Sequence, residues 1–402
     1  MVGEGRGIRG DFIPGPLTGS MPKGGSRLGA LMLPELAWGY WRRKAWLLDG
    51  LTPRKAANLC LAGTEYLAKR EVLRAWPVIV KIDISPLCNL RCTVCVHAVP
   101  HQISYLEKQR FHADQKMSVA QFRRIIDEIK GKATAVGLHY LGDPLIHPDL
   151  DEMCSIARQA DLNDHGGTNF SFPWTDERIR RHAESGVTHL TVCVDGLSQE
   201  KYGRTRVGGR IALVLSNLER LCRYKKERRL RYPWVEVQYL VFEHNRDEMQ
   251  PALELFKRLD VDQVCFKEGS QRNWASLVPR VQGPMSPGWR PFCEWPYFFM
   301  VVKYNGDVIP CCLRRLGEQY SATDNPRVLG NVFQTTLQEV WNSPAYRQIR
   351  RMCANPPQQE AVPGTSNGFC HGCGRLYDVV QESLDAHASD VSPSRQVYGP
   401  VL

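Results

Sequence analysis

Between residues 78 and 270 the sequence alternates between short stretches with the pattern of β-strands and longer stretches with the pattern of α-helices. Most of the strand-like stretches are rich in β-branched residues, and in the helix-like stretches apolar residues return every three to four positions. Such alternation predicts an α/β fold with a parallel sheet and right-handed crossovers. The expected strands lie in residues 77–88, 133–145, 161–169, 187–196, 234–242 and 261–269.

About six strand–helix units are fewer than the eight of a closed (β/α)8 barrel, so we predict a partial, TIM-like (β/α)6 barrel over residues 78–270. One helix has a clear start, because Ser118 and Gln121 have the spacing of a capping box. In sheets of this kind, functional side chains gather at the C-terminal ends of the strands. The residues that follow each strand are therefore the first candidates for a site.

A smaller C-terminal domain is predicted over residues 291–378. It follows residues 271–290, which are rich in proline and glycine and have the composition of a linker. The sequence then predicts a β-hairpin that turns at Asn305-Gly306, a strong hairpin signal, and a helix that is interrupted at Pro344. We expect this domain to consist of little more than the hairpin and the helix.

The two ends of the chain differ from the middle. Residues 1–27 are basic and rich in glycine, proline and serine, which predicts a disordered leader, and residues 28–77 predict a helical extension. Residues 379–402 have the composition of a loose tail. No stretch reaches the ~18 apolar residues of a transmembrane helix, and the start lacks the apolar core of a secretory signal. We therefore expect a cytoplasmic protein without a transmembrane segment.

The 402-residue chain is basic, with a formal net charge of +10, and its first 80 residues hold 12 Lys/Arg against 6 Asp/Glu. A basic surface suits nucleic acid, an anionic membrane or an acidic substrate, but solvated helix faces explain it more simply. The chain also has 14 cysteines. In a reducing compartment, clustered thiols indicate a metal site or catalysis rather than disulfides.

Three of these cysteines lie within eight residues, directly after the first expected strand: Cys88, Cys92 and Cys95. A structural zinc site takes four protein ligands, usually as two pairs, and no fourth ligand lies nearby in the sequence. Three thiolates in one loop leave a metal centre with one open coordination position. An open position is where a metal centre does chemistry.

The spacing Cys88-x3-Cys92-x2-Cys95 at the end of a first strand resembles the radical S-adenosylmethionine (radical SAM) superfamily. The resemblance implies that these thiolates hold three irons of a [4Fe–4S] cluster, whose fourth iron binds S-adenosylmethionine. Reductive cleavage of that cofactor then releases a 5′-deoxyadenosyl radical, chemistry that the cofactor supplies and the protein positions. The electron would come from a donor such as flavodoxin or ferredoxin.

Other motifs of that family follow in its order. Gly142-Asp143-Pro144 resembles the Gly-Glu-Pro turn that binds the cofactor's ammonium group, with an acidic side chain one methylene shorter. Thr168-Asn169 resembles a Thr-Asn-Gly turn, with a phenylalanine in place of the glycine, and the segment after residue 190 resembles the fourth strand of the family. The resemblance implies that five residues bind S-adenosylmethionine, and these are Gly142, Asp143, Asn169, Asp195 and Arg206.

The C-terminal region resembles SPASM and twitch domains, which carry auxiliary iron–sulfur clusters. Two cysteines flank the expected hairpin, a Cys-x2-Cys pair follows, and the resemblance implies that all four bind one auxiliary [4Fe–4S] cluster: Cys293, Cys311, Cys370 and Cys373. Taken alone, four cysteines also suit a zinc ribbon. Cys312 and Cys353 are spare, and either could replace one of the four ligands.

A second cluster without an open iron would accept an electron, which makes a two-electron oxidation of a sugar-like or aminocyclitol metabolite the leading hypothesis. The alternative is a radical peptide-modifying maturase, although residues 1–77 lack the pattern of a leader-binding domain. Lys267, Glu268 and Glu243 are possible bases, but the sequence singles out no catalytic residue. A hypothesis of another class is a zinc-binding, basic nucleic-acid-binding protein, whereas the radical enzyme needs no nucleic acid.

Overall fold

The structure is a computed structural model of the chain. It describes residues 49–95, 97, 113–269, 277–284, 293–311, 328–355, 370, 373 and 376–383. The predicted leader and the first part of the predicted extension, up to residue 48, lie outside these residues. In the described part, no helix is both long enough and apolar enough to cross a membrane.

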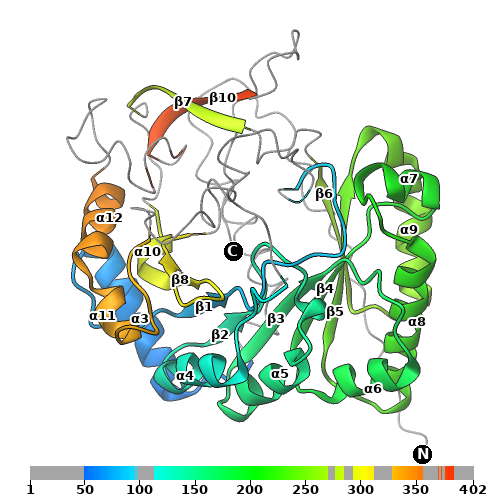
Figure 1. Ribbon diagram of the computed structural model, residues 1–402, viewed down its shortest axis with the longest axis horizontal. Coiled ribbons are helices and arrows are strands. Elements are labelled where there is room, and N and C mark those ends of the chain that lie inside the picture. Colours follow the sequence, from blue (N-terminus) through cyan, green and yellow to red (C-terminus); the bar gives the residue numbers. More distant parts are fainter. Residues whose placement is uncertain are drawn as a thin grey trace, which may run out of the picture.

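Six parallel strands, β1 to β6, form one curved sheet in sequence order (Figure 1). Neighbours pair in parallel along the whole series, from β1 with β2 to β5 with β6. This arrangement confirms the predicted partial (β/α)6 barrel. The strands are β1 (Ile79–Ile82), β2 (Ala135–Gly137), β3 (Asn163–Thr168), β4 (His189–Cys193), β5 (Trp234–Val241) and β6 (Gln263–Glu268).

Helices connect the strands and cover the outer, convex face of the sheet (Figure 1). The capping box predicted at Ser118 is confirmed, because its side chain accepts from the backbone N–H of Gln121 and the Gln121 side chain accepts in return. The helices are α4 (Val119–Ile129), α5 (Leu150–Gln159), α6 (Asp176–Glu184), α7 (Gln199–Thr205), α8 (Ile211–Glu227) and α9 (Met249–Arg258), with short 3-10 turns at η2 (Pro144–Ile146) and η3 (Glu243–Glu248).

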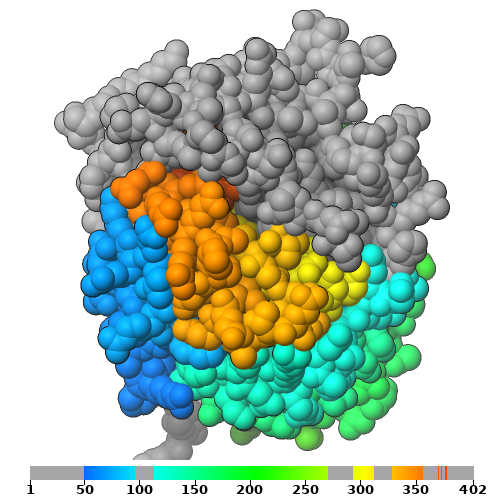
Figure 2. Space-filling model, turned by 60° about the vertical axis from the view of Figure 1, so that its left-hand side comes forward, coloured from blue at the N-terminus to red at the C-terminus, as the bar shows by residue number. Residues whose placement is uncertain are grey.

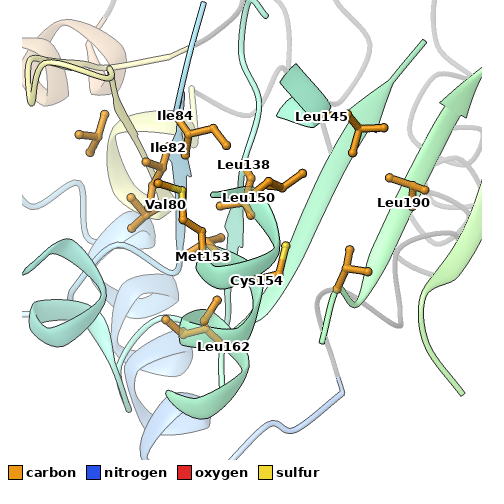
Figure 3. Close-up of a cluster of buried hydrophobic side chains, with 14 of the residues drawn as sticks. Val80, Ile82, Ile84, Leu138, Leu145, Leu150, Met153, Cys154, Leu162 and Leu190 are labelled. Atoms are coloured by element: carbon orange, nitrogen blue, oxygen red, sulfur yellow. The ribbon is translucent and has the colours of Figure 1, made fainter. Parts of the chain in front are cut away.

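The main hydrophobic core lies between the sheet and these helices (Figure 3). Val80 and Ile82 of β1 point outward and are fully buried in the same cluster as Leu150 and Met153 of α5. Because side chains alternate along a strand, the residues between them, such as Lys81, face the interior of the barrel. The interior can therefore be polar while the outer face stays apolar.

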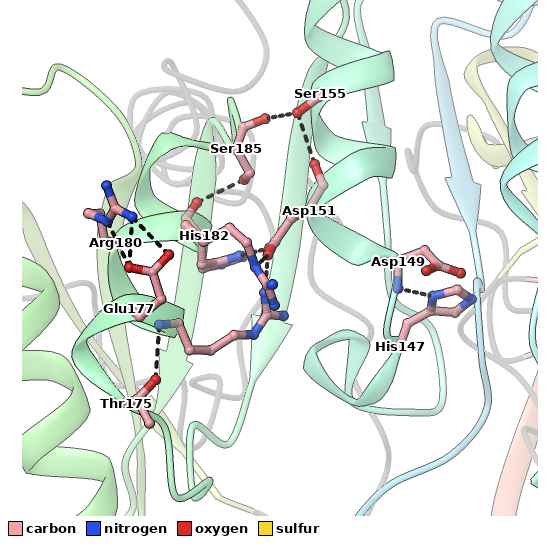
Figure 4. A network of polar contacts seen from close by, with 11 residues as sticks. His147, Asp149, Asp151, Ser155, Thr175, Glu177, Arg180, His182 and Ser185 are labelled. Carbon is pink, nitrogen blue, oxygen red and sulfur yellow. Dashed lines mark hydrogen bonds and ion pairs between the residues drawn. The ribbon is translucent and has the colours of Figure 1, made fainter.

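A polar network joins α5 to α6 on the outside of the barrel (Figure 4). The carboxylate of Asp151 forms ion pairs with Arg178 and Arg181 and accepts a hydrogen bond from His182 Nδ1 at 2.8 Å. Burial lowers the pKa of His182 to about 3, so its ring stays neutral in the folded protein. The network fixes these neighbouring helices on the outside of the barrel.

The predicted hairpin is present and extends the barrel sheet. Its first strand, β8 (Phe299–Val302), pairs in parallel with β1, and its second, β9 (Val308–Ile309), pairs antiparallel with β8. Gly306 has φ +86° at the turn, a conformation that favours glycine. The short helix α10 (Trp295–Phe298) leads directly into β8.

Helices α11 (Leu337–Trp341) and α12 (Pro344–Ala354) confirm the predicted helix with a break at Pro344, which is the first residue of α12. Figure 2 shows this segment (orange) between the hairpin segment (yellow) and the first described residues (blue), which include α3 (Pro53–Leu67). Asn342 joins two of these parts, since its Nδ2 donates to the carbonyl oxygen of Leu73 at 2.9 Å.

Two strands occur where the sequence predicted only a linker and a tail. β7 (Leu277–Pro284) lies within the predicted linker, and β10 (Tyr377–Ser383) extends into the predicted tail; the two pair antiparallel. The prediction missed them because proline and glycine in β7 have the composition of a loop, and its partner lies almost 100 residues away.

Candidate functional site

A cavity of about 360 Å³ opens at the C-terminal ends of the barrel strands. Sites of small molecules typically occupy about 300–1,000 Å³. Eight residues that the sequence singled out, far apart along the chain, line this cavity together: Cys88, Cys92, Cys95, Gly142, Asp143, Asn169, Asp195 and Arg206. The structure thus brings the predicted N-terminal metal ligands and the predicted cofactor-binding residues to one place.

The cysteine loop follows β1 and is fixed by backbone contacts to two other loops. The N–H groups of Arg91 and Thr93 donate to the carbonyl oxygens of Val207 and Thr205, both at 3.0 Å. On the other side, a Cβ built on Gly142 would lie 2.2 Å from the carbonyl oxygen of Ser85. Only a glycine allows this close approach of the two backbones.

Asp143 organises the turn after β3 rather than projecting freely into the cavity. Its Oδ2 accepts from the hydroxyl of Thr168 at 2.9 Å and from the backbone N–H of Asn169 at 2.7 Å, and Oδ1 accepts from the N–H of Leu145 at 3.1 Å. Burial raises the pKa of Asp143 to about 6, and these hydrogen bonds oppose the rise. At neutral pH the carboxylate is ionised and holds the turn.

The turn also reaches the cysteine loop. The Nδ2 of Asn169 donates to Oδ1 of Asn89 at 2.8 Å and lies 3.9 Å from the sulfur of Cys88. Phe170 stands where the resembling motif has glycine, and its φ of +54° is in the left-handed region. For a residue with a side chain, this backbone conformation is unfavourable by roughly 1–2 kcal/mol of free energy. Burial of the Phe170 ring, which is fully buried, offsets this cost.

Asp195, which is buried, and Arg206, which is partly buried, form an ion pair in the lining of the cavity. Arg206 Nε donates to Oδ2 of Asp195 at 2.5 Å, and its Nη1 lies 3.9 Å from the sulfur of Cys92. The other oxygen of Asp195 accepts from the backbone N–H of Leu240 at 3.0 Å. A guanidinium beside a thiol favours the thiolate form, which is the form that binds metal.

Cys88, Cys92 and Cys95 offer three thiolate donors, and thiolates are the usual ligands of iron–sulfur clusters. Three donors leave one iron of a four-iron cluster without a protein ligand. All three line one cavity, and the Cys95 N–H donates to the carbonyl oxygen of Cys92 at 2.9 Å, which keeps the loop tightly turned. Burial raises the pKa of Cys88 to about 12, so a metal that binds there displaces its proton.

Sequence reasoning missed a row of histidines in the barrel interior. The ring centroids of His139 and His165 lie 4.9 Å apart, as do those of His165 and His189. His189 Nε2 lies 3.3 Å from Oε2 of Glu236, and both side chains are buried. His139 and His165 line the cavity, whereas Lys267, Glu268 and Glu243, the possible bases from the sequence, do not line it.

The Nδ1 atom of His139 accepts the backbone N–H of Gly167 at 3.1 Å. A backbone N–H can only donate, so the proton of the neutral ring is on Nε2. The Nε2 atom of His165 shares a hydrogen bond with the hydroxyl of Thr191 at 2.9 Å. Alternation along β3 and β4 was the signal for this row, because every second residue of these strands faces inward.

The predicted auxiliary ligands lie around the hairpin and α12. Cys293, Cys311 and Cys370 pack against one group of buried residues, and Cys373 follows Cys370 in a turn in which the Cys373 N–H donates to the Cys370 carbonyl oxygen at 3.1 Å. Cys353 of α12, one of the two spare thiols, is buried in the main hydrophobic core. Cys312, the other spare thiol, lies outside the described residues.

Among the described residues, no three His, Cys, Asp or Glu side chains converge as ligands of a single metal ion. A four-iron cube makes a different demand, because each of its thiolates binds a different iron at a different corner. The predicted ligands, which come from the hairpin segment and the Cys-x2-Cys turn, suit that wider arrangement by the chemistry of their donors.

Two family models match the chain. The model described as the radical SAM superfamily matches residues 82–256, and SPASM, described as an iron–sulfur cluster-binding domain, matches residues 293–374. A curated relative, GTP 3′,8-cyclase of Chlorobaculum tepidum, is 25% identical over 142 residues, which is 35% of this chain and 40% of that protein. The match therefore spans less than half of the length of that relative.

Solved structures resemble the fold. Streptococcus suis SuiB bound to its precursor peptide SuiA has a TM-score of 0.52 at 14% identity, with 80% of this chain and 79% of that chain covered. BtrN in complex with AdoMet and 2-DOIA has a TM-score of 0.41 at 15% identity, with 69% and 87% covered. At these identities the similarity concerns the fold.

Proposed function

Because this chain belongs to the radical SAM superfamily and carries a SPASM domain, we propose that it oxidises a small, polar metabolite by two electrons at a carbon that bears a hydroxyl group. When bound, the cluster at Cys88, Cys92 and Cys95 and S-adenosylmethionine supply a radical that abstracts a hydrogen atom, and the auxiliary cluster supplies an electron acceptor. The chain's own residues must hold the substrate and take up its hydroxyl proton.

The observation that supports this proposal is the set of polar side chains that line the cavity on the side of the barrel interior. We call this set the polar floor of the cavity. Below the cysteine loop, the interior of the barrel presents hydrogen-bonding side chains from β1 to β5, and these include Lys81, His139, His165, Thr191 and Gln238. Trp295 and Phe299, whose ring centroids are 4.5 Å apart, line the same cavity. Several polar groups beside an aromatic wall suit a sugar-like or aminocyclitol ring.

We assign different roles to the two histidines of this floor. His139 presents an Nε2–H donor, which suits a hydrogen bond to a substrate oxygen as that oxygen becomes a carbonyl. To His165, which exchanges a hydrogen bond with Thr191 and lines the cavity, we assign the uptake of the hydroxyl proton. His189 with Glu236 supports the row from below.

We also propose that the protein is cytoplasmic and that a flavodoxin or ferredoxin supplies its electrons. Three cysteines within eight residues and a later Cys-x2-Cys pair are thiol clusters that suit metal sites in a reducing compartment. The substrate rather than a nucleic acid is the proposed partner, because the chemistry of the site lies in an interior cavity.

The test is anaerobic turnover of the reconstituted protein with S-adenosylmethionine, a strong reductant, and a panel of aminocyclitols, amino sugars and short peptides in deuterated water. We expect 5′-deoxyadenosine and a product two mass units lighter than its substrate. A product of unchanged mass that contains solvent deuterium would indicate epimerisation and reject the oxidation. If only peptides support turnover, the chain is a peptide maturase instead.

Two controls separate the enzyme from the zinc hypothesis. The radical enzyme should contain about eight irons per chain, whereas the alternative protein would contain zinc and be colourless. Replacing Cys92 with alanine should abolish 5′-deoxyadenosine while leaving the auxiliary iron in place.

A further inference from the structure

The cysteine loop has one side in the cavity and the other side in solvent. Along this loop, Leu90 and Cys92 are buried and line the cavity, whereas Asn89, Arg91 and Thr93, which alternate with them, are exposed. One stretch of backbone therefore separates the N-terminal cluster ligands from the surface. The electron that reduces this cluster comes from outside the protein, and the exposed side of the loop is close to where it must arrive.

A second loop continues this exposed side. The N–H of Arg91 donates to the carbonyl oxygen of Val207 at 3.0 Å. Ser171 joins Asn89 to Arg210, because its carbonyl oxygen accepts from Nδ2 of Asn89 and its hydroxyl oxygen accepts from the N–H of Arg210, both at 2.9 Å. We call the exposed residues that these contacts bring together the arginine patch: Asn89, Arg91, Val207 and Arg210.

The arginine patch is positively charged and contains an apolar side chain. Arg91 and Arg210 are exposed, and neither guanidinium forms an ion pair with a side chain in the described part of the chain. Arg204, three residues before Val207, differs because it pairs with Glu200 at 2.7 Å. Val207 is 44% exposed, which few large apolar side chains of the described residues reach. Arginines around an exposed apolar residue suit the binding of an acidic protein.

On both loops the arginine patch is one residue away from a contact with a cluster ligand. Arg91 directly precedes Cys92, and Val207 directly follows Arg206, whose Nη1 lies 3.9 Å from the sulfur of Cys92. A protein bound at the patch would hold its own redox group close to the N-terminal cluster, and the rate of electron tunnelling falls steeply with distance. Complexes of electron carriers bury less than about 1,200 Å² of surface, so a small patch is sufficient.

We propose that the arginine patch is the surface where an acidic electron carrier, the flavodoxin or ferredoxin of the proposed function, docks to reduce the N-terminal cluster. The reduced carrier loses one electron and the cluster gains it, and no bond is made or broken. Carboxylates on the carrier complement Arg91 and Arg210, which steers the encounter and fixes its orientation. This inference depends on the proposed electron carrier and is independent of the substrate and of its oxidation.

The experiment measures how a flavodoxin and a ferredoxin bind to the anaerobically reconstituted protein, and how much 5′-deoxyadenosine each reduced carrier produces with S-adenosylmethionine in the absence of substrate. In Arg91→Glu with Arg210→Glu, the dissociation constant of the carrier should rise by more than about tenfold, and carrier-driven 5′-deoxyadenosine should fall. Arg91→Lys with Arg210→Lys keeps both charges and should keep most of the affinity. Dithionite, which needs no docking, should produce equal amounts in all variants.

The matched control is Arg228→Glu with Arg229→Glu. It makes the same change of net charge at two exposed arginines beyond the far end of α8, which begins next to Arg210 and is about 25 Å long. This variant should bind the carriers as the unmodified protein does.

Three outcomes overturn the proposal. The first is an equal change of affinity, or no change, in the two charge-reversed variants. The second is that neither carrier binds to the unmodified protein. The third is that Arg91→Glu with Arg210→Glu also loses 5′-deoxyadenosine with dithionite, which would mean that these arginines support the cluster itself. Substrate oxidation plays no part in these measurements, so a failure of the proposed oxidation leaves their result standing.

Discussion

The absence of a side chain at Gly167 leaves room for the imidazole of His139 against strand β3. A Cβ built on Gly167 would lie 3.0 Å from Nε2 of His139 and 3.2 Å from its Cδ2. The same glycine donates its N–H to Nδ1 of that ring at 3.1 Å. One residue therefore sets both the position and the tautomer of the proposed substrate-binding donor.

We predict that Gly167→Ala displaces the His139 ring, because a methyl group at that distance requires the ring to move. The measurement is long-range ¹H–¹⁵N NMR of protein labelled with ¹⁵N-histidine, with the His139 signals assigned by a His139→Gln variant. In the unmodified protein we expect the neutral Nε2–H pattern at His139. In Gly167→Ala its signals should shift.

Gly166→Ala is the matched control, since a Cβ on Gly166 points to the other face of the strand. It would meet only Leu190 and Pro144, both at 3.7 Å, which is an ordinary contact. This variant should leave the His139 signals unchanged. A similar shift in both variants, or none in Gly167→Ala, would contradict the assigned geometry.

Single site residues could be predicted from the sequence where they belong to a family motif. Residues that only line the cavity were missed. Asp195 and Arg206 could be named because the motif order places them after the fourth strand. His165 lies in a strand with two glycines and two acidic or amide residues, a weak strand pattern. Its place in the row of histidines is set only when β3 pairs with β4 and brings it beside His189.

Among the helices, α12 is held to the rest of the molecule by a buried arginine. Arg350 donates to the carbonyl oxygens of Pro296, Glu71 and Trp341 at 2.7 to 2.9 Å, and its guanidinium lies 4.5 Å from the Trp341 ring. Burial lowers the pKa of Arg350 to about 10, so it stays charged at neutral pH. The guanidinium of Arg350 thus joins α12 to three other parts of the chain, at Glu71, Pro296 and Trp341.

We predict that Arg350→Leu lowers the free energy of unfolding by more than about 3 kcal/mol. Leucine fills part of the space but removes the donor of two buried carbonyl groups, those of Pro296 and Trp341, and of the partly buried carbonyl of Glu71, and each buried group left without a donor costs about 1–3 kcal/mol. The control is Arg351→Leu, one residue further on, because Arg351 is exposed and pairs with Glu71 at the surface. Exposed pairs contribute about 1 kcal/mol or less. Anaerobic denaturant titration measures both; equal losses would refute the role of Arg350.

The elements that could be predicted from the sequence are those with local signals. The helix after Ser118 has a capping box and an apolar face, and the hairpin has Asn305-Gly306 at its turn. The pairing of β7 with β10 has no local signal, because it joins residues about 100 positions apart.

At the scale of the whole molecule, the hairpin and the barrel form one sheet through β8 and β1, and a buried carboxylate lies next to this junction. Asp83, directly after β1, is fully buried, and its Oδ1 accepts the backbone N–H of Tyr140 at 3.2 Å. Burial raises the pKa of Asp83 to about 7, although Lys303 of the hairpin and Lys81 oppose the rise. Within the described residues, its Oδ2 has no hydrogen-bond partner.

This pKa makes the stability of the whole molecule depend on pH. The folded pKa of Asp83 exceeds the ordinary value of 3.8, so the folded state holds a proton that the unfolded state has released between these values. The contribution is therefore full below about pH 4 and is lost as the pH rises to about 7. Between pH 5.5 and 8 the loss amounts to about 2 kcal/mol.

We predict that Asp83→Asn removes this part of the pH dependence, because asparagine does not titrate. The measurement is the midpoint temperature of anaerobic thermal unfolding at pH 5.5 and pH 8. In the unmodified protein the midpoint should fall toward pH 8, and in Asp83→Asn it should fall less. Asp176→Asn, at an exposed carboxylate, should keep the original dependence. If Asp83→Asn and Asp176→Asn give the same change with pH, Asp83 is ionised in the folded protein throughout this range, and Lys303 then compensates its burial fully.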